Sequence, residues 1–210
     1  MLSSLTIGLL GLDIAGDIQN FYHRNTGSTL PAGWHNQISA GGELTAMYSL
    51  SLQKSLLPVR DSARYSHEFS STVEGNLGFS TDINTGLSWR WGRIHSPWWS
   101  FNPAHAEYAS LGMPVIAAAK REQPEFYLWA GANLKYRFYS SIFQGQFRHS
   151  NYTLSHDEMK NLIAEAWLGF TREFANGYHL SIFIRGSSAE FIGPNAEKQL
   201  WSGIALSRAM

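Results

Sequence analysis

In this 210-residue sequence, Gln19 and His23 are two polar residues whose types and spacing suit general acid–base catalysis. Side chains four residues apart share one face of a helix and lie one turn from each other. Histidine is a ready general base near neutral pH. A glutamine one turn away can orient the base or a substrate. The spacing makes His23 a candidate general base and Gln19 a candidate positioning residue, although a single histidine on a helix more often has no such role.

The segment that holds both residues is predicted to form a short amphipathic helix over residues 13–24. Its apolar residues recur at helical spacing and are Ile14, Ile18, Phe21 and Tyr22. Asp13 can cap the N-terminus of this helix, and Asn25 to Gly27, followed by Pro31, end it. A helix of this kind interrupts a chain that otherwise has the pattern of strands. It is therefore expected to belong to a functional loop.

Two other polar clusters are interpreted as loop residues. His149 and Ser150 are adjacent, and adjacent residues of a strand point to opposite faces. The run of Ser155, His156 and Asp157 is contiguous, and proximity in sequence does not build a catalytic triad.

Two further groups have several interpretations. The long segment 92–124 carries Trp98, Trp99 and Phe101, which suit interfacial anchors, a plug or a loop that covers a barrel mouth. Five charged residues of the predicted strands are most simply a network of paired charges in a lumen: Glu74, Lys135, Arg137, Glu165 and Arg185.

The composition indicates which elements position these residues. Charged residues make up 15% of the chain, against about 25% in soluble domains. Aromatic residues reach 14%, yet mean hydropathy is only −0.21 and no apolar run has the roughly 20 residues of a membrane helix. This combination is typical of an antiparallel transmembrane β-barrel. The absence of cysteine excludes disulfides and thiolate metal sites, and a net charge of zero argues against nucleic acid as a partner.

Period-two alternation predicts eight strands in a single domain over residues 1–210. The clearest is Phe126–Tyr139, in which apolar and mixed faces alternate. The eight predicted strands are Leu2–Leu10, Leu44–Gln53, Glu68–Leu77, Ile83–Trp91, Phe126–Tyr139, Leu162–Phe174, Tyr178–Phe191 and Gln199–Arg208. A soluble β-sandwich also alternates, but it does not account for the strand length or for polar faces that mix Lys, Arg and Glu with Gly and Ser.

Several segments in order resemble the outer-membrane lipid A 3′-O-deacylase (LpxR-like) family. These segments are Leu5–Gly11, Gln19–His23, Gly33–Gln37, Phe126–Gly145 and Asn161–Phe170. The helix with Gln-x-x-x-His, followed by Gly-Trp-x-Asn-Gln, is the most specific of them.

The resemblance implies a twelve-stranded barrel whose active site lies between the barrel wall and a helix of an extracellular loop. It also implies a calcium-dependent reaction in which the histidine matched by His23 activates a water to attack the 3′ ester of lipid A. The glutamine matched by Gln19 lines that site.

Topology agrees with this resemblance, because eight strands are four fewer than twelve and an even difference preserves the direction of each later strand. The chain is thus expected to lack the family's first strands, with their Asn-Asp pair and metal ligands, and its first residues make a poor signal peptide. Two local departures are His35, where the family usually has Asp, and the final Met210.

The predicted function is hydrolysis of the 3′ acyl ester of lipid A in the bacterial outer membrane by a monomeric protein, with calcium as cofactor and lipid A and outer-membrane lipids as partners. The alternatives are a non-catalytic barrel, either structural or pore-forming, and a catalytically incomplete fragment of the enzyme. Whether eight strands close on themselves is a question for the structure.

Overall fold

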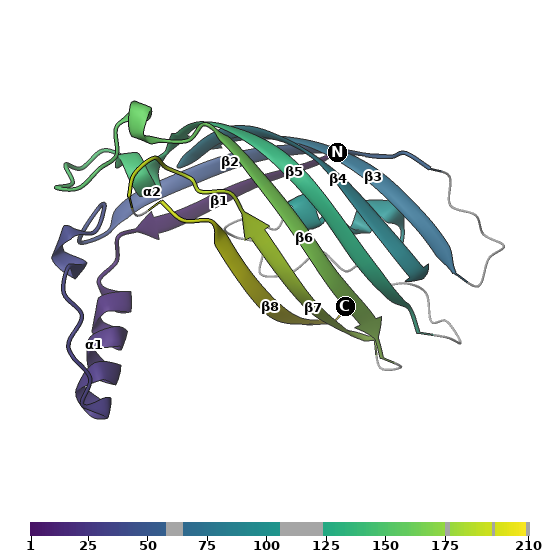
Figure 1. Ribbon diagram of the computed structural model, residues 1–210, viewed down its shortest axis with the longest axis horizontal. Coiled ribbons are helices and arrows are strands. Elements are labelled where there is room, and N and C mark those ends of the chain that lie inside the picture. Colours follow the sequence, from purple (N-terminus) through teal and green to yellow (C-terminus); the bar gives the residue numbers. More distant parts are fainter. Residues whose placement is uncertain (58–64, 106–123, 175–176, 195, 209–210) are drawn as a thin grey trace.

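The computed structural model describes residues 1–57, 65–105, 124–174, 177–194 and 196–208 (Figure 1). All eight predicted strands form one antiparallel sheet in which each strand pairs with the next along the chain. The strands are β1 Leu2–Leu10, β2 Glu43–Ser55, β3 Ser66–Gly78, β4 Ser80–Arg93, β5 Phe126–Ser140, β6 Leu162–Glu173, β7 Tyr178–Ser187 and β8 Gln199–Arg208. The helices are α1 Ile14–Thr26 and α2 Ser141–Gln144, with short 3-10 turns η1 Trp34–Asn36, η2 Trp98–Ser100, η3 Pro103–His105 and η4 His156–Glu158.

Most element boundaries differ from the prediction by one to four residues, and two of these differences have a local cause. Strand β7 ends at Ser187, and Phe191 forms only an isolated bridge with Met159, because the chain turns away after its last pairing with β6. Helix α1 extends to Thr26, two residues beyond its predicted end, and Gly27 closes it in the left-handed conformation that glycine adopts readily.

The two faces of the sheet have opposite polarity, in the sense expected for a membrane barrel. The concave face buries polar and charged side chains, and the convex face exposes aliphatic and aromatic ones. On β5, for example, Asn133 and Lys135 are buried while Leu134 and Tyr136 are about half exposed. A soluble sandwich would bury the apolar face against a second sheet, whereas the described strands all lie in one sheet. The prediction of a membrane barrel is confirmed.

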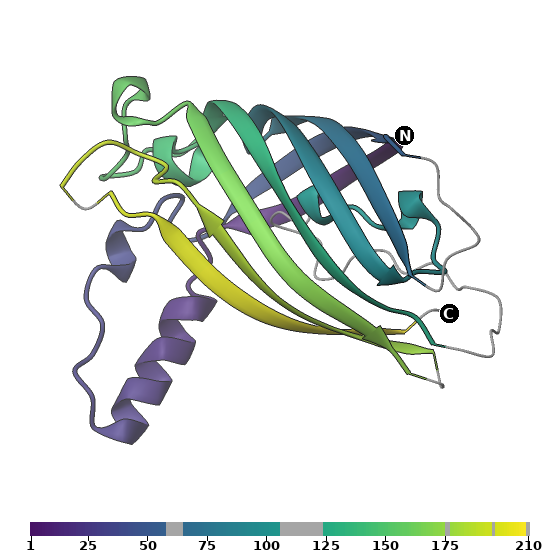
Figure 2. The same ribbon diagram turned by 45° about the vertical axis from the view of Figure 1, so that its right-hand side comes forward.

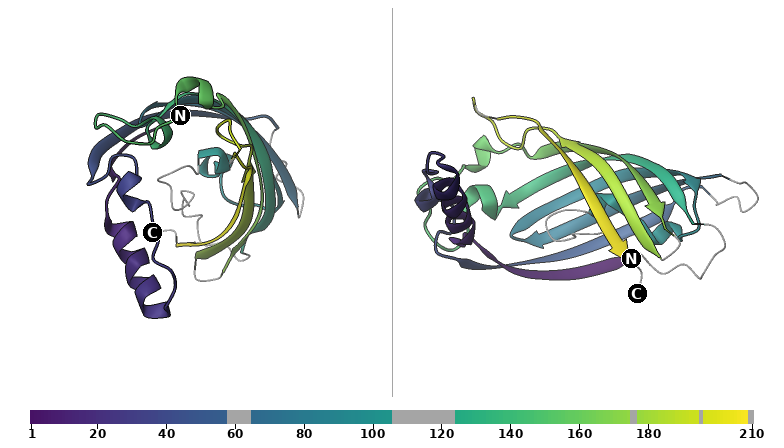
Figure 3. Two further views of the ribbon diagram at one scale, coloured as in Figure 1. Left: turned by 60° about the vertical axis from the view of Figure 1, so that its left-hand side comes forward. Right: turned by 90° about the horizontal axis from the view of Figure 1, so that it is seen from below.

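The sheet curls around a central space but stays open along one side (Figure 3). Strands β1 and β8 each pair along one edge only within the described residues. The described part of the chain is therefore an open half-barrel. Its helices include none long and apolar enough to cross a membrane.

Ion pairs fill the concave face, as predicted from the charged residues of the strands. Glu165 on β6 accepts from Lys135 at 3.4 Å and from Arg185 at 2.6 Å. Arg137 pairs with Glu190 at 2.9 Å. Apart from the partly buried Glu190, these groups are almost fully buried, and a buried charge is tolerated only when it is paired and hydrogen-bonded.

Residues 94–105, which we term the inner segment, enter the curve of the sheet (Figure 3, left). Phe101 is buried against Tyr127 and Trp129, with its ring 5.6 and 5.5 Å from theirs. Gln53 on β2 donates to the Phe101 carbonyl at 2.7 Å, and Arg185 on β7 donates to that of Pro103 at 3.0 Å. Of the three interpretations of segment 92–124, the plug fits residues 94–105, and residues 106–123 lie outside the described part.

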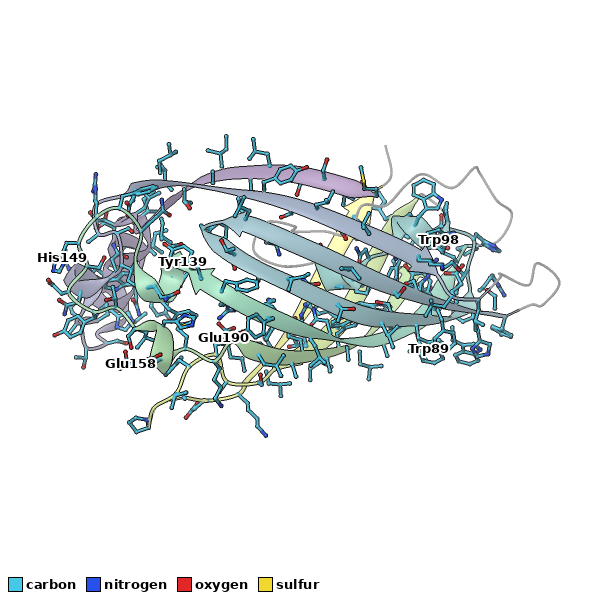
Figure 4. The ribbon with its side chains drawn as sticks, turned by 90° about the horizontal axis from the view of Figure 1, so that it is seen from above. Trp89, Trp98, Tyr139, His149, Glu158 and Glu190 are labelled. Atoms are coloured by element: carbon cyan, nitrogen blue, oxygen red, sulfur yellow. The ribbon has the colours of Figure 1, made fainter. Side chains whose placement is uncertain are left out.

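Aromatic side chains gather at the end of the sheet opposite α1. Trp89 stacks on His67 at 6.1 Å, and Tyr65 stacks on Trp91 at 5.9 Å (Figure 4). Outward-facing aromatic rings at a barrel rim are typical of the membrane–water interface.

The packing of the concave face can be tested by a substitution at the contact between Gly169 and Trp129. Gly169 lies directly opposite Trp129 in the β5–β6 register, and a Cβ there would overlap the Trp129 ring. We expect Gly169→Ala to lower the free energy of unfolding by about 1–3 kcal/mol, because the ring must move out of a packed cluster. Urea unfolding in lipid vesicles, followed by tryptophan fluorescence, measures this change.

The matched control is Gly75→Ala on β3, where a Cβ meets nothing within 4 Å. Equal stability of the two variants would contradict this account of the cluster.

Candidate functional site

Helix α1 and the segment that returns from it form a folded loop at one end of the sheet, beyond β1 and β2 (Figure 1). The start of β1 and the end of β8 lie away from this loop (Figure 2). The base of the loop closes where the Gly42 N–H donates to the Gly11 carbonyl at 3.1 Å. Gly11 has a φ of 74°, and a Cβ there would overlap the Ser39 carbonyl. The narrow base thus requires glycine.

The inner face of α1 packs against Trp34 in the returning segment. Gly16 is the buried residue of the helix, and a Cβ on it would lie only 3.1 Å from the Trp34 ring. The indole N–H of Trp34 donates to Oε1 of Gln19 at 2.8 Å. Because an indole N–H is only a donor, this bond places the Gln19 oxygen at Trp34 and leaves the amide N–H₂ as a donor toward a ligand.

His23 lies on the same face as Gly16 and Gln19, as the helical spacing predicts. Its Nδ1 is 2.5 Å from the Thr29 carbonyl oxygen. A carbonyl only accepts, so Nδ1 carries the proton and Nε2 presents a lone pair. Among the described residues, Nε2 has no hydrogen-bond partner. The structure therefore places the two predicted site residues on one face of α1, each held by one hydrogen bond.

The role predicted for Asp13 is wrong in one respect. Asp13 occupies the position before α1, but its backbone is already helical and its side chain makes no capping bond. Its carboxylate instead accepts from Gln37 at 3.2 Å, and the same Gln37 amide donates to the Gly11 carbonyl at 3.0 Å. Asp13 thus ties the start of the helix to the returning segment.

The opposite face of α1 is apolar and uncovered by the described residues. Its exposed fractions are 59% for Ile14, 64% for Ile18 and 71% for Phe21. An exposed apolar stripe of this kind suits contact with lipid. The helix therefore has one polar face with the candidate chemistry and one face of lipid-like character.

A carboxylate at the rim, Glu43, joins the α1 loop to the loop 141–161. It accepts from the Ser39 hydroxyl and from the backbone N–H groups of Phe147 and Arg148, the latter two at 2.7 and 3.0 Å. Ser39 is fully buried with a positive φ of 57°, unusual for a residue with a side chain. Its N–H donates to the Ser150 hydroxyl at 3.1 Å. Contacts spanning more than 100 residues of sequence thus hold the base of the α1 loop.

The other polar clusters form no catalytic constellation in the described structure. His149 lies in the loop region near α1 (Figure 4) and is exposed, and Ser150 is used by Ser39. Ser155 and Glu158 form a capping box around η4, and the Ser155 N–H and hydroxyl hold the pKa of the Glu158 carboxyl below its usual value. The interpretation of both clusters as loop residues agrees with this arrangement.

The described residues do not fit a calcium site. No group of three or more His, Cys, Asp or Glu side chains gathers anywhere in the described ranges. Asp13 holds Gln37, and Asp17 stands exposed in the first turn of α1. Calcium prefers six to eight oxygen ligands, a set that these two carboxylates do not supply.

Three contributors to this site were not predicted individually: the Thr29 carbonyl, the Trp34 indole and Glu43. Trp34 belongs to the Gly-Trp-x-Asn-Gln motif, so its presence was a signal, although its bond to Gln19 was not foreseen. A backbone carbonyl carries no sequence signal. Glu43 also carried no sequence signal, because its backbone partners Phe147 and Arg148 lie in another loop.

Comparisons with known proteins bear on the fold and the family. The model of the family described as "Outer membrane protein LpxR" matches residues 2–210. Among solved structures, LpxR from Salmonella typhimurium superposes with a TM-score of 0.76 at 16% identity, over 99% of this chain and 66% of that chain. The outer membrane enzyme PagL gives a TM-score of 0.36 at 10% identity, over 79% of this chain and 90% of that chain.

No curated protein matches the sequence. The superposition on LpxR supports the half-barrel fold, and the family match covers nearly every residue from β1 to the last strand. The chain therefore belongs to the LpxR family of outer membrane proteins.

Proposed function

We propose that this protein removes the 3′ acyl chain of lipid A by hydrolysing its ester, with His23 as general base. The observation that carries the proposal is the pair of bonds on one face of α1. Thr29 fixes the protonated Nδ1 of His23, and Trp34 fixes the oxygen of Gln19. A base and a donor are thereby oriented one helical turn apart.

The chemistry follows from these two orientations. Nε2 of His23 accepts a proton from water, and the water oxygen attacks the ester carbonyl carbon. The negative charge that develops on the carbonyl oxygen is stabilised by the Gln19 amide N–H₂. Collapse of the tetrahedral intermediate breaks the bond to the sugar oxygen, which takes the proton back from His23. The products are a free fatty acid and a sugar hydroxyl.

The surroundings of the helix suit a substrate with acyl chains. The convex wall of the sheet is apolar, and Ile14, Ile18 and Phe21 expose an apolar face on α1 itself. A lipid A molecule of the outer leaflet would reach the loop sideways from the membrane. This orientation places α1 on the extracellular side, as the family resemblance implies.

Calcium is part of the proposal as a requirement of the reaction. The described carboxylates near α1 do not assemble a site for it, so no step above depends on the ion. The roles of His23 and Gln19 rest on the bonds of α1 alone.

The activity itself is tested by mass spectrometry of lipid A incubated with the protein in detergent, with calcium or with a chelator. We expect loss of one acyl chain, from the 3′ position, only in the sample with calcium. Lipid A that stays intact in both samples would contradict the proposal for this chain and favour a catalytically incomplete fragment or a non-catalytic barrel.

His23→Ala is expected to lower the rate of deacylation by about 10²–10⁴-fold, because the general base is lost. His149→Ala is the matched control, since it removes an exposed histidine from another loop near α1. Both variants should retain the heat-modifiable migration of a folded barrel in gel electrophoresis. Full activity of His23→Ala would refute its assignment as the base.

Gln19→Ala is expected to lower kcat by roughly 10²–10³-fold with a smaller change in KM, because the donor acts on charge that exists only in the transition state. Asn20→Ala, at the next position of the same helix, controls for helix stability. A rise in KM at constant kcat would instead assign Gln19 to substrate binding.

A further inference from the structure

A groove of about 1280 Å³ spans β4 to β8, away from α1. Its lining includes outward residues of the convex wall and, between them along each strand, inward-facing residues such as Asn133, Glu165 and Arg185. The outward side chains along it are almost all apolar. They include Leu87, Ala132, Ala166, Leu168, Ile184 and Leu200. None of the residues that line the groove comes from α1 or β1.

The strand register explains why the wall is hollowed here. Ala132 lies directly opposite Ala166, and Ala166 lies directly opposite Gly186. Three small residues on three neighbouring strands thus form a low floor. Leu87 stands beside this row on β4 and Leu200 on β8, so longer side chains rise on both sides.

The groove is continuous with the surface that the barrel presents to the membrane. Leu134 on one side and Leu168 on the other are each at least half exposed, as a lipid-facing wall requires. Acyl chains are the neighbours of such a wall. Because lipid tails are as apolar as leucine, a chain held in the groove gains mainly by closer packing.

A positively charged side chain, Lys198, lies at the end of the groove nearest to the α1 loop. Lys198 lines it, is exposed and has no ion-pair partner among the described residues. It precedes β8, and the described residues 188–194 and 196–198 lie at the same end of the sheet as α1 (Figure 2). A lysine near the bilayer surface contributes about 1 kcal/mol of attraction to an anionic lipid. The groove therefore joins an apolar channel to a positive charge at head-group depth.

We propose that this groove is a second lipid site, which holds an acyl chain of one lipid A molecule with a phosphate of its head group at Lys198. The choice of lipid A rests on the orientation adopted for the proposed function, with α1 and Lys198 on the outer side. The site is separate from the one at His23, so a lipid bound here is retained and not hydrolysed.

The test is native mass spectrometry of the purified protein in detergent, titrated with lipid A or with phosphatidylethanolamine. All samples carry His23→Ala, which keeps lipid A intact, so binding is read independently of deacylation. Ala166→Phe fills the groove. Ala130→Phe makes the same change on the same wall, at an outward residue that does not line the groove.

We expect two bound lipid A molecules in the His23→Ala protein and in the Ala130→Phe variant. The Ala166→Phe variant should lose the second molecule and keep the one at α1. Lys198→Gln should weaken lipid A binding about fivefold and leave phosphatidylethanolamine unchanged. Should Ala166→Phe fail to fold, Ala132→Leu fills the same row.

Two results would overturn the proposal. The first is equal lipid A binding by the Ala166→Phe and Ala130→Phe variants. The second is equal binding of lipid A and phosphatidylethanolamine, together with no effect of Lys198→Gln on either. Neither result bears on hydrolysis at His23, which is measured by the acyl-chain assay on the protein with His23 intact.

Discussion

The bilayer imposes the constraint on which the rest of this structure depends. Lipid offers no hydrogen bonds, so each backbone group inside the membrane must be paired within the sheet. Long antiparallel strands, each paired with its chain neighbour, meet that requirement for every strand between β1 and β8. The same constraint reverses the usual polarity, so that Lys135 and Glu165 are inside while Leu134 and Leu168 are outside. At the outer edges of β1 and β8, the backbone groups have no partner strand among the described residues.

A polar interior could conduct ions, but here the inner segment occupies part of it. The inner segment places Phe101 between Arg90 and the rings of Tyr127 and Trp129, and its carbonyls accept from residues of the wall. Charges on the concave face neutralise one another across neighbouring strands. The loop end and the convex wall are the surfaces that face away from this interior.

The α1 loop is built by its own contacts and is then fixed to the sheet. Trp34 packs on Gly16 and bonds Gln19, which makes the helix and the returning segment one unit. The base of this unit is held by the Gly11–Gly42 bond and by Glu43, which reaches the loop after α2. The catalytic role proposed for His23 would need this second attachment, since an error of about 1 Å in position lowers a rate markedly. Its uncovered apolar face, with Phe21 at its centre, is consistent with a place beside lipid.

The sequence by itself determined the strands, their alternation and the helix with Gln19 and His23, because each depends on a local period of two or 3.6 residues. It also indicated the paired charges, since Lys135 and Glu165 fall on the polar faces of neighbouring strands. Only the tertiary structure decided which carbonyl fixes His23, which ring fixes Gln19, and that Phe101 enters the sheet. It alone aligned Ala132 with Ala166 as the floor of a groove. These features join residues far apart in the chain or use backbone atoms, and neither leaves a periodic signal in the sequence.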